Sequence, residues 1–334
     1  MTFLKELDMK TRTLFDTTTV LALVLLAGCS DAGPPPPSAP LTATGRGLPI
    51  RRDGEFLATA APTTKDILPT GKGIDVQDDP NPPARTRFKV EYHGAPVLAG
   101  VRNLYAIFYG YWPNVVGTFE IYADFLSNLG SSPYFQIAAR YPNADGQAPS
   151  GGLFYAGAEI DAFSHGPTLS DADIADIVSA KILAGALPLD PSGIYVIIAS
   201  PDVWASSGLD VNYCAMHGTS VTLGFSSPYI FVGGPARSPT RCAPQSVGPN
   251  GTLNADAAVS LIAAELFNTV TDPTLGAWFD RYGLEPADKC AWTFGTTYTA
   301  PNGAKANVHL GSRDYLLQQL WLPTKTGGAC ALHS

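Results

Sequence analysis

The sequence has little charge and no excess of basic residues. Charged residues make up 15% of its 334 residues, and 29 acidic side chains outnumber 21 basic ones for a net charge of −8. Proteins that hold nucleic acid by its phosphates need a basic face, so this balance excludes nucleic acid as a partner. A hydrophobic content of 45% with 10% aromatic residues argues against disorder throughout the chain.

Motifs typical of several enzyme classes are also missing. No Gly-x-Ser-x-Gly segment predicts a serine nucleophile, and no Cys-x-x-Cys pair indicates a zinc–thiolate site. Five cysteines are too few for a small scaffold built on disulfides, and no repeat of fixed period occurs. The informative features are therefore the N-terminal segment, the cysteine positions and a helix near the C-terminus.

The N-terminal segment has the pattern of an export signal. A basic stretch at residues 9–12 precedes an apolar run at residues 20–27, which is shorter than the roughly 20 apolar residues of a membrane-spanning helix. The letters LAGC at residues 26–29 resemble the bacterial lipobox, in which the cysteine carries the lipid. We predict a lipoprotein-type signal peptide over residues 1–28, with Cys29 as the lipid attachment site. The alternative is a simple secretory signal in which Cys29 has no role.

A proline-rich tether is predicted over residues 29–85. Eleven prolines fall in this stretch, among Ala, Gly, Thr and Ser, and no apolar periodicity accompanies them. Such a segment cannot bury a core and stands partly extended as polyproline II. The alternative for residues 54–74 is an irregular arm packed on the domain. The predicted location is the outer membrane or the cell surface, or otherwise outside the cell.

Residues 86–334 are predicted to form a single layered α/β domain. Apolar runs rich in β-branched and aromatic residues indicate strands, and apolar residues at helical spacing indicate helices. The predicted strands are residues 104–109, 135–141, 194–200 and 229–232; the predicted helices are residues 117–129, 171–182 (with Ser170 as N-cap) and 256–270; residues 142–152 and 233–254 are predicted loops. This alternation predicts a central mixed sheet flanked by helices.

The four cysteines after Cys29 form an even set: Cys214, Cys242, Cys290 and Cys330. In an exported protein, two disulfides are the expected arrangement. Three connectivities are possible, and we favour Cys214–Cys242 with Cys290–Cys330 because each closes a local loop. A zinc–thiolate site is the competing interpretation.

Short motifs run through the domain in a fixed order. They are VEYHGAPVL at 90–98, NLY at 103–105, YGYW at 109–112, SHG at 164–166, LPLD at 187–190, GIYV at 193–196, SPDV at 200–203, CAMH at 214–217, DKCAW at 288–292 and QQLW at 318–321. The ordered set resembles the EXORDIUM (phosphate-induced protein) family of plants and bacteria. The resemblance implies a secreted protein, associated in plants with the cell wall and cell expansion. It implies no settled biochemical activity.

The resemblance also draws attention to the helix predicted at residues 256–270. Many family members carry His-Glu-Leu there, usually with a Glu four residues after the His, so that both side chains reach one metal as in the zincin proteases. This predicts a zincin-like helix in the C-terminal third of the domain. Here Ala264 stands in place of the His and Asn268 in place of the second acidic residue, so both ligand positions are degenerate. Glu265 remains as the candidate catalytic remnant.

Two interpretations of the nearby acidic residues stay open. In the first, Glu265, Glu285 and Asp288 hold a metal ion, Ca²⁺ suiting hard oxygen ligands and Zn²⁺ a drifted zincin site. In the second, which we favour, no cofactor is bound, Glu265 is a helix-surface or network residue and Asp288 belongs to a turn. His217 is predicted to be a packed, hydrogen-bonded histidine rather than a ligand.

These features predict a lipid-anchored, non-catalytic binding protein of the cell envelope. Its predicted partners are the membrane, through the lipid, and a glycan or protein of the envelope. The aromatic residues at 109–112 are candidates for glycan contact, with a core role as the alternative. A metal-dependent hydrolase with an altered zincin-like site is the alternative function.

Overall fold

The computed structural model describes residues 66–69, 88–113 and 117–334. The predicted signal peptide, Cys29 and most of the predicted tether lie outside these residues. Within the described residues, no helix combines the length and apolar character needed to cross a membrane.

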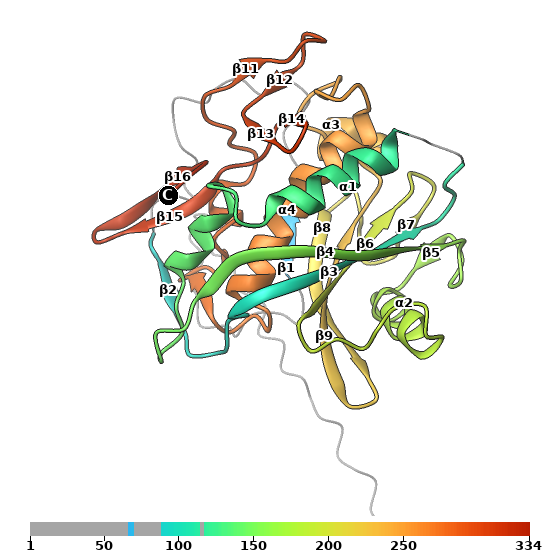
Figure 1. The fold of residues 1–334 in the computed structure, drawn as a ribbon, viewed down its shortest axis with the longest axis horizontal. Coiled ribbons are helices and arrows are strands. Elements are labelled where there is room, and N and C mark those ends of the chain that lie inside the picture. Colours follow the sequence, from blue (N-terminus) through green and yellow to red (C-terminus); the bar gives the residue numbers. More distant parts are fainter. Residues whose placement is uncertain (1–65, 70–87, 114–116) are drawn as a thin grey trace, which may run out of the picture. The chain divides into compact units, whose positions relative to one another are not determined.

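A mixed sheet forms the centre of the described domain, as predicted (Figure 1). Its strand order is β1 (Asp66–Pro69), β8 (Tyr213–Thr222), β9 (Phe225–Val232), β6 (Gly193–Ala199), β3 (Gly100–Tyr109) and β4 (Pro149–Asp161). Strands β9, β6, β3 and β4 are parallel to one another. Strand β8 runs antiparallel to β9, and β1 antiparallel to β8.

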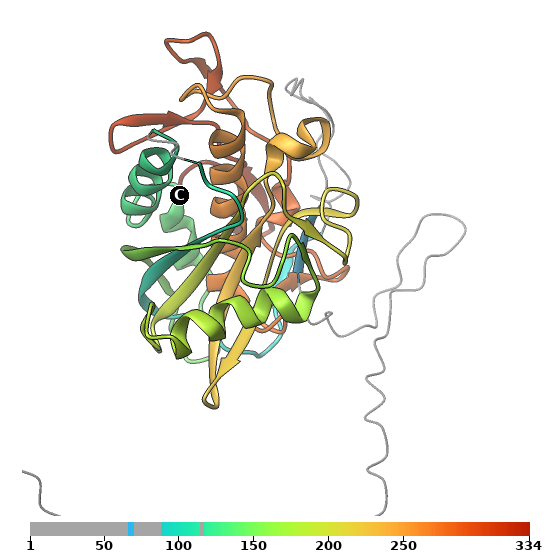
Figure 2. The same ribbon diagram turned by 90° about the vertical axis from the view of Figure 1, so that its right-hand side faces the viewer.

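Helices cover both faces of this sheet. Alternate side chains of β3 point to opposite faces, so Leu104 and Phe108 join one core while Ile107 joins the other. The first core contains α1 (Thr118–Leu129) and α4 (Leu253–Thr271), and the second contains α2 (Asp171–Leu183). Figure 2 shows α2 on the opposite side of the sheet from α1 and α4.

The strand predicted at residues 194–200 is confirmed as β6, and every one of its residues is buried. A continuously apolar strand needs cover on both faces, and its place between β3 and β9 provides that. The strands predicted at 104–109 and 229–232 are confirmed within β3 and β9, as are all three predicted helices.

The strand predicted at residues 135–141 is wrong. The segment forms the 3-10 helix η2 (Phe135–Arg140), which begins where the Phe135 amide donates to Ser132 Oγ at 3.1 Å. Its apolar residues at positions 135, 137 and 138 are buried and fit either structure, so the pattern alone does not separate them. The predicted loop at 142–152 ends early because the glycine-containing strand β4 starts at Pro149.

The remaining elements are short. Residues 233–254, predicted as a loop, contain η3 (Pro235–Arg237), α3 (Pro239–Cys242) and the start of α4. The paired short strands are β2 (Val90–Tyr92) with β10 (Trp278–Asp280), β5 (Thr168–Leu169) with β7 (Trp204–Ala205), β11 (Tyr298–Thr299) with β12 (Lys305–Ala306), β13 (Val308–Leu310) with β14 (Arg313–Tyr315), and β15 (Leu320–Thr324) with β16 (Gly327–Ala331). The 3-10 helix η4 (Asp288–Cys290) precedes the last three pairs.

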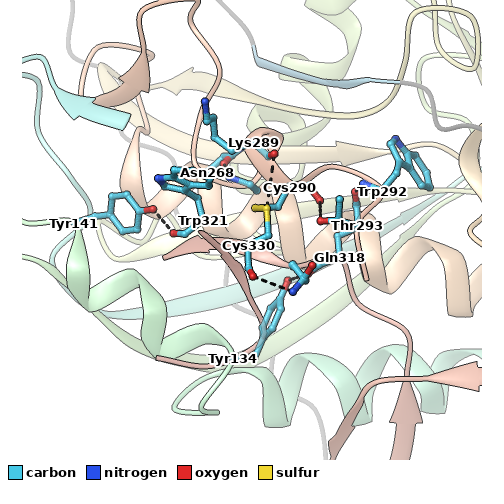
Figure 3. Close-up of a disulfide and its surroundings, with 12 residues drawn as sticks. Tyr134, Tyr141, Asn268, Lys289, Cys290, Trp292, Thr293, Gln318, Trp321 and Cys330 are labelled. Atoms are coloured by element: carbon cyan, nitrogen blue, oxygen red, sulfur yellow. Dashed lines mark hydrogen bonds between the residues drawn. A yellow bond between two sulfur atoms is a disulfide. The ribbon is translucent and has the colours of Figure 1, made fainter. Parts of the chain in front are cut away.

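The cysteines of the described residues form the two favoured bridges, Cys214–Cys242 and Cys290–Cys330. The first joins β8 to α3, and the second joins η4 to β16. Figure 3 shows the second bridge beside Trp321 of β15, whose backbone oxygen accepts a hydrogen bond from Tyr141. The bridge thus holds the C-terminal hairpin against the rest of the domain.

Helix α2 starts at a complete capping box. Ser170 Oγ accepts from the Asp173 amide at 3.2 Å, and Asp173 Oδ2 accepts from the Ser170 amide at 2.7 Å. The hydrogen bonds that the Ser170 amide and hydroxyl donate to the Asp173 carboxylate lower the pKa of Asp173.

Replacing Ser170 with Ala is therefore expected to lower the free energy of unfolding by about 1 kcal/mol. Urea unfolding at pH 7 measures this change. Ser179→Ala is the matched control, because Ser179 lies on the same helix but outside the cap. An equal loss in the two variants would contradict a capping role for Ser170.

Candidate functional site

Helix α4 is almost wholly enclosed by the domain. The predicted apolar face is buried, and so are most of the polar residues on its other sides, including Glu265 and Asn268. Ala264, at the position of the family's His, is buried in the apolar core with Val259 and Phe267. The helix exists as predicted, but its surroundings do not support a zincin-like role.

Glu265 contacts His217, which comes from the neighbouring strand β8. Glu265 Oε2 lies 3.2 Å from His217 Nδ1, and Glu285 Oε2 lies 4.0 Å from His217 Nε2; all three side chains are buried. His217 Nε2 is also 3.3 Å from the backbone oxygen of Asp272. Because a carbonyl oxygen only accepts, this contact needs a proton on Nε2, and a second proton on Nδ1 would make the ring a cation facing Glu265.

Asn268 joins α4 to the segment that carries Asp288. Its Nδ2 donates to Asp288 Oδ1 at 3.3 Å, and its Oδ1 accepts from the Ala287 amide at 2.8 Å. Asp288 Oδ2 in turn accepts from the Glu285 amide at 3.3 Å. A neutral amide supplies the donor and the acceptor that these contacts require, whereas a Glu at this position would place a second carboxylate beside Asp288.

The three candidate metal ligands therefore have different contacts in the structure. Glu265 and Glu285 both face His217, while Asp288 contacts Asn268 and the turn at Glu285. Within residues 88–113 and 117–334, no group of three or more His, Cys, Asp or Glu side chains has the arrangement of a metal site. The interpretation of this cluster as a zincin-like metal centre is not supported.

A buried ion pair lies next to this cluster and was not predicted. Lys289 Nζ is 2.5 Å from Asp280 Oδ2, and both side chains are buried. Burial lowers the pKa of Lys289, and the hydrogen bond and charge of Asp280 oppose that change. The pair connects η4 to β10, and its only sequence signal is a lysine directly before a cysteine of the core.

The aromatic residues after β3 have different surroundings. Tyr109 is buried, and Trp112 is partly buried against Phe108 and Phe119. Tyr111 is 65% exposed. The sequence therefore identified a surface aromatic residue here, but Tyr109 and Trp112 belong to the packing of the domain.

Comparison with known families decides how the domain is classified. The family description "Phosphate-induced protein 1 conserved region" matches residues 90–331, from β2 to the end of β16. The chain belongs to this family. The family region therefore contains the His217–Glu265 pair, both disulfides and the whole of α4.

Three proteins from Arabidopsis thaliana show the extent of the similarity. Protein EXORDIUM-like 3 is 28% identical over 273 residues, covering 70% of this chain and 80% of that protein. Protein EXORDIUM-like 5 is 26% identical over 276 residues, covering 70% and 75%. Protein EXORDIUM-like 4 is 32% identical over 171 residues, covering 44% and 56%. No solved structure matches the chain significantly.

Proposed function

We propose that this family member is an exported, lipid-anchored, non-catalytic binding protein of the cell envelope. The observation that carries the proposal is the disulfide pairing of its cysteines. The four cysteines of the described residues pair with one another, and Cys29 is the fifth in the sequence. Cys29 stands at the lipidated position of a lipobox-like segment.

The cysteine pairing also supports export. Structural disulfides persist in oxidising compartments and are rare in the cytosol. Both bridges lie within the family region, and each connects two different secondary-structure elements. A protein that depends on these bridges needs an oxidising environment to reach its folded state.

The burial of the candidate site supports a non-catalytic role. A general base must come within hydrogen-bonding distance of its substrate. Glu265 is 0% exposed and faces His217, while Glu285 and Asp288 are also buried. The contacts of these groups connect β8, α4 and η4, so their role is to stabilise the packing of these elements.

Replacing Cys29 with Ser is expected to release the protein from membranes, because the hydroxyl of Ser does not replace the thiol that accepts the lipid. Fractionation of a bacterial host expressing each form, together with labelled palmitate, measures the change. Ser30→Ala is the control and is expected to remain membrane-bound and labelled. A wild-type protein that does not incorporate palmitate would contradict the lipid-anchor proposal.

A further inference from the structure

The loops that follow the parallel strands meet at one edge of the sheet. Parallel strands β4, β3 and β6 end at Asp161, Tyr109 and Ala199, and β5 and β7 lie at the same edge (Figure 1). The Gly110 amide donates to the backbone oxygen of Asp161 at 2.8 Å, and the Tyr111 amide donates to Ser200 Oγ at 2.9 Å. Ligands of open α/β sheets bind at the carboxyl ends of such strands.

This edge presents an aromatic ring that is held in place. Trp204 of β7 is 53% exposed, yet the Arg237 guanidinium lies 3.6 Å from the centroid of its ring. Arg237 is itself fixed by Asp210, with Nε 2.6 Å from Oδ2. The Trp204 amide donates to the Pro167 oxygen at 2.7 Å. An exposed ring ordered from one side loses little entropy when a ligand stacks on the other side.

The loops that follow β4 and β6 carry polar groups at the same edge of the sheet. Ser164 is exposed, and its Oγ lies 2.8 Å from both Asp161 Oδ2 and His165 Nδ1. Asp202 is exposed two residues before Trp204 and accepts a hydrogen bond from Ser200 Oγ. Hydroxyl, imidazole and carboxylate groups supply both donors and acceptors.

The same loops are tied to one another through Tyr109. Its buried hydroxyl donates to the Gly166 oxygen at 2.7 Å and accepts from the His165 amide at 3.0 Å. The loop after β4 is thereby fixed to the end of β3, beside the exposed ring of Tyr111. The polar groups and the aromatic rings of this edge therefore sit on a common rigid support.

We propose that this edge binds a neutral glycan, with a pyranose ring stacked on Trp204 and its hydroxyls bonded by Asp202, Ser164 and Tyr111. The inference rests on the proposed binding role and names its ligand class. Sugars present apolar C–H faces to aromatic rings and paired hydroxyls to carboxylates.

The charges at the edge favour an uncharged sugar over the alternatives. Arg237 already occupies one face of the Trp204 ring, so a cationic ligand on the other face would meet a like charge through the ring. An anionic ligand would approach the exposed carboxylate of Asp202. A neutral polyol avoids both costs.

Titration of the full-length protein, purified in detergent, with cellohexaose and chitohexaose tests the inference by tryptophan fluorescence and calorimetry. Trp204→Ala is expected to weaken binding about tenfold, the upper part of the range for one aromatic stacking contact. Trp204→Phe keeps a ring and is expected to recover most of the affinity. Phe225→Ala is the matched control, because Phe225 is 57% exposed on β9, which begins at the end of the sheet opposite to this edge.

Three outcomes would overturn the inference. They are no binding of either oligosaccharide by the wild type, equal affinities for Trp204→Ala and Phe225→Ala, and tighter binding of hexagalacturonate than of the neutral probes. Circular dichroism establishes that each variant is folded. Palmitate labelling and membrane release at Cys29 report on the lipid anchor independently, so failure at this edge and failure of the anchor proposal are distinguishable.

Discussion

Replacing Glu265 with Ala is expected to lower the free energy of unfolding by about 3–5 kcal/mol, because it leaves a cavity in the core and removes a hydrogen-bonding partner of a buried imidazole. Glu265 is fully buried, and its Oε2 lies 3.2 Å from Nδ1 of the buried His217. Truncation leaves the imidazole with one contact fewer in a low-dielectric interior and opens a cavity beside it. Both consequences lower the free energy of unfolding.

Urea unfolding of the wild type and two further variants measures this effect. Glu265→Gln keeps the size of the side chain and one acceptor, so its loss is expected to fall between wild type and Glu265→Ala. Glu120→Ala is the surface control, because Glu120 is 63% exposed and its Oε2 lies 3.5 Å from Arg313. The expected loss there is below about 0.5 kcal/mol. Similar losses for the two alanine variants would show that the His217 contact contributes little.

Removing the Cys290–Cys330 bridge is expected to cost about 4 kcal/mol, because the bridge restricts an unfolded chain whose two cysteines are 40 residues apart. The double variant Cys290→Ser/Cys330→Ser also frees the C-terminal hairpin from η4. The same turn carries Asp288 and Lys289, so the loss is expected to loosen the buried cluster as well.

The second bridge provides a matched comparison for this prediction. Cys214→Ser/Cys242→Ser opens a loop with a separation of 28, and the same entropy relation makes its loss about 0.3 kcal/mol smaller. Urea unfolding without reductant gives both values. A loss below about 1 kcal/mol for the Cys290→Ser/Cys330→Ser protein would contradict the stabilising role assigned to the bridge.

Much of the framework followed from local patterns. The apolar run at 194–199 predicted the fully buried strand β6, and Ser170 predicted the start of α2. Sequence proximity alone favoured the disulfide pairing found here. Each of these features depends on contacts over a few residues or on the closure of a short loop, so composition and spacing carry the information.

Other elements could not be predicted from the sequence because their apolar patterns fit more than one secondary structure. The apolar residues of 135–141 suit a strand or a 3-10 helix, and the hydrogen bond from Ser132 favours the helix. Strand β4 contains glycines and alternates partly buried with exposed residues along much of its length, so its pairing with β3 is what stabilises it. Pairing partners lie outside the window in which such patterns are read.

In the candidate site, too, some features follow from the local sequence and others from long-range packing. The sequence by itself determined that α4 exists, that Ala264 and Asn268 replace two ligand positions, and that Glu265 remains, because these are properties of one helix. Only the tertiary structure decided that Glu265 faces His217, 48 residues away, at the centre of the domain. That contact forms because β8 packs against α4 and the C-terminal segments cover the helix, and long-range packing of this kind leaves no local signal in the sequence.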